Sequence, residues 1–257
     1  MGMRSISLRR AREIGGAMLR KLLTELKMHG SLEALETIGH IKGKEEFALT
    51  LLEAERDYRH QTAITNRMKK AAFPIDKEWS DIDPLLNPGI DYKAVQALGN
   101  GEFVRKKENL CIMGQQGTGK SHSLVALHRH LCREGFSVKF YTACGLVNIL
   151  EEAKAKNRLN KLMQEILKPS VIIIDELGFV PFSENGACLL FDVFASRYER
   201  GSIAVSTNLS FDKWVQVFGS VELTAALVDR FTHKAHIHIY EGPSVRFRNA
   251  KQKIKDN

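Results

Sequence analysis

The segment GQQGTGKS at residues 114–121 restricts the fold of this 257-residue chain more than any other feature. It matches G-x-x-x-x-G-K-[ST], a pattern in which glycines let backbone N–H groups surround phosphate oxygens at the start of a helix. The apolar run NLCIM precedes the segment and an amphipathic helical pattern follows it, as such a loop requires. The predicted nucleotide-binding residues are Gly114, Gln115, Gln116, Gly117, Thr118, Gly119, Lys120, Ser121 and His122.

A pair of acids follows in the run VIIIDE at 171–176. A carboxylate at the tip of a buried strand is costly unless it binds a cation, so we predict that Asp175 and the Ser121 hydroxyl ligate Mg²⁺. Lys120 is predicted to reach the β- and γ-phosphates. Glu176 is predicted to orient the attacking water, which indicates hydrolysis of ATP; the alternative is that the two acids merely cap the strand.

Strand and helix patterns alternate from about residue 103 onward. This alternation predicts an α/β fold with a five-stranded, mostly parallel sheet. The predicted strands are 109–113, 137–143, 171–175, 202–208 and 236–242, and the predicted helices are 121–133, 146–167, 183–200 and 223–232.

The N-terminal part shows helical periodicity over residues 17–70, in three segments, and its last helix is predicted to stop at Pro74. We therefore expect a small all-helical domain over residues 1–73. A proline-rich linker over 74–102 is expected to dock on the nucleotide domain, residues 103–248. A basic tail, 249–257, completes the chain.

Charge is distributed unevenly along the chain. Of the net charge of +8, residues 1–70 carry +5 (14 Lys and Arg against 9 Asp and Glu) and residues 243–257 carry +4 (5 against 1), which leaves −1 for the middle. Basic ends on a neutral nucleotide domain indicate a polyanionic partner, most plausibly nucleic acid. For the basic tail alone, solubility is the favoured alternative.

Other classes of protein are disfavoured by composition. The apolar runs are shorter than the roughly 18 residues of a membrane span, and the basic N-terminus lacks the apolar core of a signal peptide, although an organelle transit peptide is a remaining alternative. The cysteines have no zinc-type spacing, so a reduced cytoplasmic protein without structural metal is expected. These cysteines are Cys111, Cys132, Cys144 and Cys188.

Two other kinds of P-loop protein are weighed against ATPase. A GTPase would need an N-K-x-D element on a later strand, and the nearest fragment, Asn160-Lys161, lies upstream of the acids. A small-molecule kinase would need an Arg-rich lid, and the late arginines are only Arg230, Arg246 and Arg248. The kinase is therefore a less favoured alternative.

The motifs GTGKSH, DELGFVPFSENGACLLFDVFASRYERGS, STNLSFDKW, VFGS and LVDRFTH resemble the IstB-like ATPases, over roughly residues 20–248. These are AAA+ helper proteins of insertion-sequence transposons, related to DnaC-type helicase loaders. The resemblance implies a bacterial, cytoplasmic, homo-oligomeric ATPase with ATP sites at subunit interfaces. It would assemble on duplex DNA and recruit or stimulate a partner transposase. The alternative is a DnaC-like loader that binds single-stranded DNA and a replicative helicase.

The same resemblance implies roles for three further residues. Asn208, at the polar end of strand 202–208, resembles the sensor-1 position. Arg230 resembles the arginine finger, although from the residues alone it could equally pair with Asp229 or another acid. Arg246 resembles the sensor-2 arginine, with Val245 in place of the usual Tyr. Gln115 and Gln116 replace two usual prolines, which leaves the rate of hydrolysis open.

Two basic patches are candidates for DNA contact. Lys154, Arg158 and Lys161 lie at i, i+4 and i+7 and would share one face of the predicted helix 146–167. The second patch is Arg67, Lys69 and Lys70. The alternative for both is an ordinary solvated surface, and DNA contact here would be phosphate-dominated and strongly salt-dependent.

Overall fold

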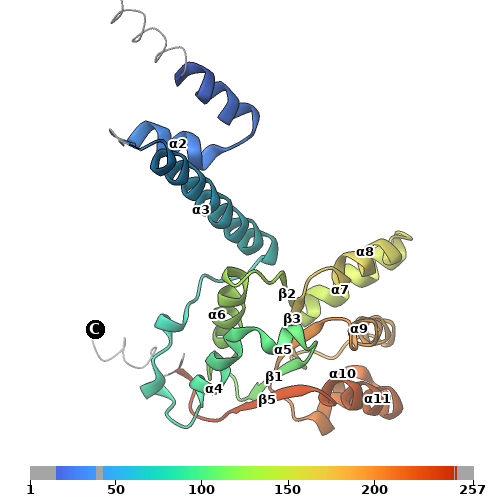
Figure 1. Cartoon of the computed structure of the whole chain (residues 1–257). Coiled ribbons are helices and arrows are strands. Elements are labelled where there is room, and N and C mark those ends of the chain that lie inside the picture. Colours follow the sequence, from blue (N-terminus) through green and yellow to red (C-terminus); the bar gives the residue numbers. More distant parts are fainter. Residues whose placement is uncertain (1–15, 39–42, 246, 248–257) are drawn as a thin grey trace, which may run out of the picture. The chain divides into compact units, whose positions relative to one another are not determined.

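The computed structural model describes residues 16–38, 43–245 and 247. The chain forms two compact units, residues 1–66 and 67–257, so the division falls inside a helix rather than at Pro74. Each unit is described by itself (Figure 1). No helix in the described part of the chain is long and apolar enough to cross a membrane.

The first unit is helical, as the periodicity predicts. Residues 16–25 form a helix, followed by α2 (His29–Thr37) and α3 (Lys44–Ala71). The start of α2 lies directly against α3, because a Cβ atom on Gly30 would be 2.4 Å from the carbonyl oxygen of Ala54. The buried Ser31 Oγ donates to the Leu51 carbonyl at 2.6 Å. These contacts hold α2 and α3 together with very few buried apolar side chains.

The second unit is built on a parallel sheet, and the predicted strands are confirmed. Over the described residues the sheet has five strands in the order β2-β3-β4-β1-β5. Because β4 lies between β3 and β1 and the strands are parallel, the carboxyl ends of these three strands meet at one edge of the sheet. The strands are β1 (Asn109–Gly114), β2 (Val138–Thr142), β3 (Val171–Leu177), β4 (Ser202–Thr207) and β5 (Ala235–Tyr240).

Helices cover both faces of this sheet (Figure 1). One face packs against α6 (Lys120–Arg133) and the short helices α4 (Tyr92–Ala97) and α5 (Glu102–Arg105). Because both faces of the sheet are buried, residues 171–174 of β3 are all apolar. The other face packs against α7 (Ala143–Ala155), α8 (Leu159–Leu167), α9 (Glu184–Arg197), α10 (Val215–Phe218) and α11 (Val221–Thr232).

The prediction of one long helix over 146–167 is wrong. The helix is interrupted at Asn157, whose φ of 54° is left-handed. The Asn157 N–H donates to the Lys154 carbonyl and the Arg158 N–H to the Ala153 carbonyl, the pattern of a Schellman helix end. Asparagine tolerates this conformation better than most residues, so α7 ends here and α8 starts at Leu159.

The segment 74–102, predicted to be a linker that docks on the nucleotide domain, is an ordered part of the second unit. Ile90, Tyr92 and Val95 are buried in the same core as α6. Three short 3₁₀ turns, η1 (Trp79–Asp81), η2 (Pro84–Leu86) and η3 (Leu98–Asn100), occur in this described segment. A fourth, η4 (Phe211–Trp214), precedes α10. The first two turns lie where the chain passes the phosphate-binding loop.

Candidate functional site

The loop between β1 and α6 has the shape of a phosphate cradle. Gly114 lies so close to β5 that a Cβ atom there would be 2.0 Å from the Tyr240 carbonyl oxygen. Gly117 has a left-handed φ of 76°, and its carbonyl accepts the N–H of Val245 at 2.9 Å. The loop leads into the first turn of α6 at Gly119, and a helix start of this kind binds anions.

Lys120 lies inside this loop. Its Nζ donates to the Gly114 and Gln115 carbonyls, at 2.7 Å each. The buried Thr118 Oγ1 also donates to the Gln115 carbonyl, at 2.9 Å. The loop is therefore preformed around its lysine, and Gln115 contributes through its backbone.

Ser206, near the end of β4, joins the two acids. Its hydroxyl donates to Asp175 Oδ1 and accepts the N–H of Glu176 at 3.0 Å. Ser121 Oγ donates to the same Asp175 oxygen at 2.9 Å. From the sequence, Asn208 was selected as the functional residue at the polar end of β4, and Ser206 was not. The hydrogen bonds of Ser206 depend on β3 lying beside β4 in the sheet.

The Ser121 and Asp175 oxygens fit a Mg²⁺ site. Both are hard oxygen ligands, and their separation of 2.9 Å is that of adjacent ligands around an octahedral ion with bonds of about 2.1 Å. Asp175 is only 4% exposed, so its carboxylate is held in place for a cation.

Glu176 is directed away from the sheet by its backbone. The register between β3 and β4 shifts between Ile174 and Leu177, and Glu176 has a left-handed φ of 62°. Bulges of this kind redirect side chains beside active sites. Its exposed carboxylate faces a pocket that also contains Lys120 and Asn208. The full lining is Gln116, Gly117, Lys120, Ser121, Glu176, Phe179, Ser206, Thr207 and Asn208.

A second pocket lies against the same loop, and sequence reasoning missed most of it. Its wall comes from the segment 75–86 that was predicted to be a linker, together with Tyr92 and Val245. His122 is placed here, with Nε2 at 3.2 Å from the Glu78 carbonyl oxygen, and burial lowers the pKa of this imidazole. The wall residues are Ile75, Lys77, Asp81, Ile82, Asp83, Leu86, Tyr92 and Val245, and the loop side is Gly117 to His122.

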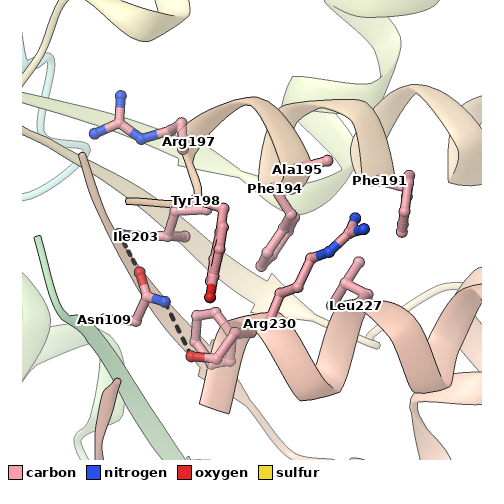
Figure 2. A pocket seen from close by; sticks show the side chains of 10 residues that line it. Asn109, Phe191, Phe194, Ala195, Arg197, Tyr198, Ile203, Leu227 and Arg230 are labelled. Carbon is pink, nitrogen blue, oxygen red and sulfur yellow. Dashed lines mark hydrogen bonds between the residues drawn. The ribbon is translucent and has the colours of Figure 1, made fainter. Parts of the chain in front are cut away.

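Arg230 does not belong to either pocket as far as the described residues line them. It lies on α11 with an exposed guanidinium, whose carbon is 5.9 Å from the centre of the Phe191 ring on α9. Figure 2 shows this guanidinium beside Phe191 and Leu227 at a small cleft between the two helices. Beneath the cleft, the Asn109 amide joins the Phe231 carbonyl to the Ile203 N–H.

The proposed basic face on helix 146–167 does not exist as predicted, because the helix break separates its members. Lys154 Nζ bonds Asn185 Oδ1 on α9. Arg158 and Lys161 instead line a groove between α7 and α8, over an apolar floor that includes Leu162.

In the second basic patch, the Nε of Arg67 donates to the Cys132 carbonyl at 2.7 Å. Lys69 and Lys70 are exposed. Arg246 lies outside the described residues.

The second unit has the fold of AAA+ P-loop NTPases. A solved DNA replication initiation factor is similar with a TM-score of 0.53 and 22% identity, covering 68% of this chain and 53% of that one. A crystal structure of DnaI is similar with a TM-score of 0.51 and 19% identity, covering 65% and 89%. Similarity at these identities shows the fold alone.

Sequence relatives cover almost the whole chain. The ATP-binding protein of insertion sequence IS21 from Pseudomonas aeruginosa is 33% identical over 239 residues, which are 91% of this chain and 90% of that protein. That of insertion sequence IS5376 from Geobacillus stearothermophilus is 33% identical over 214 residues, 82% and 85%. The family model described as IstB-like ATP binding protein matches residues 21–253. The predicted resemblance is thus confirmed, and the chain belongs to the family of IstB-like ATP-binding proteins.

Proposed function

We propose that the chain is a Mg²⁺-dependent ATPase of a bacterial cytoplasm that assembles on duplex DNA and assists a partner transposase in selecting its target. The observation that carries the ATPase part is the bond network of Ser206. It fixes the Mg²⁺-ligand candidate Asp175 and the backbone of Glu176 beside Lys120. A site with one carboxylate for a cation and a second for a water is suited to hydrolysis.

Each residue at the loop has a distinct part in this reaction. Lys120 Nζ would exchange its two carbonyl acceptors for phosphate oxygens. Bound by Ser121 and Asp175, Mg²⁺ would neutralise charge on the β- and γ-phosphates. Glu176 would accept a hydrogen bond from the attacking water, and Asn208 would hold that water or a γ-phosphate oxygen from the other side of the pocket.

Assembly into oligomers is supported by the position of Arg230. The residue is exposed on α11 and, over the described residues, outside the pocket of its own chain. An arginine that stabilises the charge of the transition state can be supplied by a neighbouring subunit. We therefore place the Arg230 of one subunit at the ATP site of the next.

The DNA and transposase parts rest on the relatives and on charge. The curated relatives are proteins of insertion sequences. Arg158 and Lys161 line the groove between α7 and α8, and the chain is basic at both ends. Chemistry on DNA strands would belong to the partner.

The ATPase part is tested by two substitutions at the site. Lys120→Ala should abolish ATP binding, because the loop loses the cation that would bind the phosphates. Glu176→Gln should bind ATP normally and hydrolyse it at least about 100-fold more slowly, since the amide is a poor acceptor for the water proton. Binding is measured with a fluorescent ATP analogue and turnover by phosphate release. Normal turnover by Glu176→Gln would refute the role of this carboxylate.

A further inference from the structure

Charged side chains hold the segment 75–86 against the helix that carries the phosphate loop. Glu78 accepts hydrogen bonds from Arg129 Nε at 2.7 Å and from Arg133 Nη1 at 3.0 Å. Arg129 Nη2 also lies 2.5 Å from Asp76 Oδ1. Arg133 Nη2 donates to the same carboxylate as well. Both arginines are on α6, one helical turn apart, so a single carboxylate receives three charge-assisted hydrogen bonds from two guanidinium groups.

The backbone of Glu78 adds two further contacts. Its carbonyl oxygen lies 3.2 Å from His122 Nε2, in the first turn of α6, and its N–H donates to Asp81 Oδ2 at 2.9 Å. His122 lies 7 and 11 residues before Arg129 and Arg133, so all three share one face of α6. Residue 78 is thus joined to α6 near both ends of the helix.

In the described structure, the Glu78 carboxylate bonds Arg129 and Arg133, beyond the phosphate loop, whereas its carbonyl contacts His122 on the loop side of the pocket. The Glu78 side chain is 31% exposed and that of Arg129 18% exposed, whereas the loop is held by its own bonds from Lys120 and Thr118. The neighbours of Glu78 in the chain, such as Lys77, Asp81 and Ile82, instead line the second pocket. This pocket shares Gly117, Lys120 and Ser121 with the pocket of Glu176 but is not lined by Glu176. A nucleotide whose phosphates lie in the loop can therefore extend its nucleoside part into it.

We propose that Glu78 is a positioning residue for the nucleoside half of ATP. Glu78 holds the segment 75–86, which forms the wall of the second pocket, against α6. It thereby sets the affinity for the nucleotide without contacting phosphate. The inference rests on the proposed ATPase function. If the segment 75–86 were not held against α6, only a fraction of the molecules would have a formed pocket for the nucleoside. The apparent affinity for ATP would then be reduced to that fraction of its full value.

The test compares two ligands, ATP and inorganic tripolyphosphate, which shares the phosphate chain but has no nucleoside. Glu78→Gln should weaken ATP binding about tenfold, as expected for the loss of a charged partner of two arginines. Tripolyphosphate, measured by competition against a fluorescent ATP analogue with Mg²⁺ present, should bind as to the wild type. KM for ATP should rise about tenfold while kcat changes by less than about twofold.

Glu102→Gln is the matched control, because Glu102 is an exposed acid of the same unit that pairs with Lys106 at 2.7 Å. It should leave both affinities unchanged. Unchanged ATP binding by Glu78→Gln would overturn the inference, and so would an equal loss of ATP and tripolyphosphate binding, which indicates general damage to α6. Lys120→Ala separates the two proposals: if it still binds both ligands, the proposed ATP site is wrong, whatever Glu78 does.

Discussion

Glu176 has a left-handed backbone, with a φ of 62°, although it is not a glycine. This conformation costs roughly 1 kcal/mol, because Cβ approaches the backbone carbonyl. The bond from its N–H to Ser206 Oγ, at 3.0 Å, helps to hold it there. This backbone conformation directs the carboxylate out of the sheet and into the pocket, where it would meet the water that attacks the γ-phosphate.

A second residue, His128 in α6, links the stability of the protein to pH. It is fully buried, its Nδ1 lies 2.7 Å from the Leu124 carbonyl, and its Nε2 has no hydrogen-bond partner among the described residues. Burial lowers the pKa of His128 to about 4. Between this value and about 6.5 the unfolded chain therefore binds a proton that the folded chain does not.

Stability should consequently fall as the pH drops below about 6.5. At pH 5 the contribution of His128 is a loss on the order of 2 kcal/mol in the free energy of unfolding. Urea denaturation of the wild type and of His128→Gln, each at pH 7 and pH 5, measures it as the difference between their pH dependences. Equal pH dependence in the two proteins would show that this histidine does not titrate as described.

At the scale of elements, the break between α7 and α8 decides which basic residues can act together. Lys154 bonds Asn185 on α9, whereas Arg158 and Lys161 line the groove between α7 and α8. The groove is also lined by Lys156 and by the acids Glu152 and Glu165, so its lining carries charges of both signs with a small basic excess. If the groove binds DNA, Arg158 and Lys161 should contribute to the affinity for DNA, whereas Lys154 should not.

We expect Lys161→Ala to weaken binding of duplex DNA with ATP present and to reduce the slope of log K against log salt by about 1. Lys154→Ala, its matched control, should have little effect on either quantity. Fluorescence anisotropy at several salt concentrations measures both, with a single strand of the same sequence as second ligand. Equal losses in the two variants would argue against the groove, and a preference for single strands would favour a helicase loader.

The sequence predicts those elements whose local pattern and tertiary environment agree. The apolar run of β3 and the loop before α6 were predictable because their signals are contiguous in the chain. The break at Asn157 was missed because helical periodicity continues across it, and a single residue carries the signal. The segment 75–86 was predicted to be part of a linker because its own sequence has no helical or strand pattern. Its structure depends on contacts with Arg129 and Arg133, which are far away in sequence.

At the scale of the whole molecule, Arg230 and the phosphate loop are on different elements and line different cavities of the described structure. Within one chain, Arg230 therefore does not line the pocket of the phosphate loop, as far as the described residues form it. If the Arg230 of one subunit lies at the ATP site of the next, as proposed, the contact would be head-to-tail and could repeat into rings or helical filaments.

Mixing two inactive variants tests this arrangement. Glu176→Gln retains Arg230, and Arg230→Ala retains Glu176, so neither should hydrolyse ATP well alone. In a random equal mixture about a quarter of the interfaces would join an intact Glu176 to an intact Arg230 of the neighbour. ATP turnover of the mixture should recover to about that fraction of wild type. A mixture no more active than its components would place Arg230 in its own chain's chemistry or outside the reaction.

The position of β1 in the sheet has a consequence for the order in which the protein matures during synthesis. The neighbours of β1 are β4 and β5, which leave the ribosome well after the phosphate loop itself. Gly114 packs on Tyr240, and the Gly117 carbonyl receives the N–H of Val245. A nascent chain therefore exposes its N-terminal helices long before it can complete a nucleotide site, and ATP can act only on a nearly finished molecule.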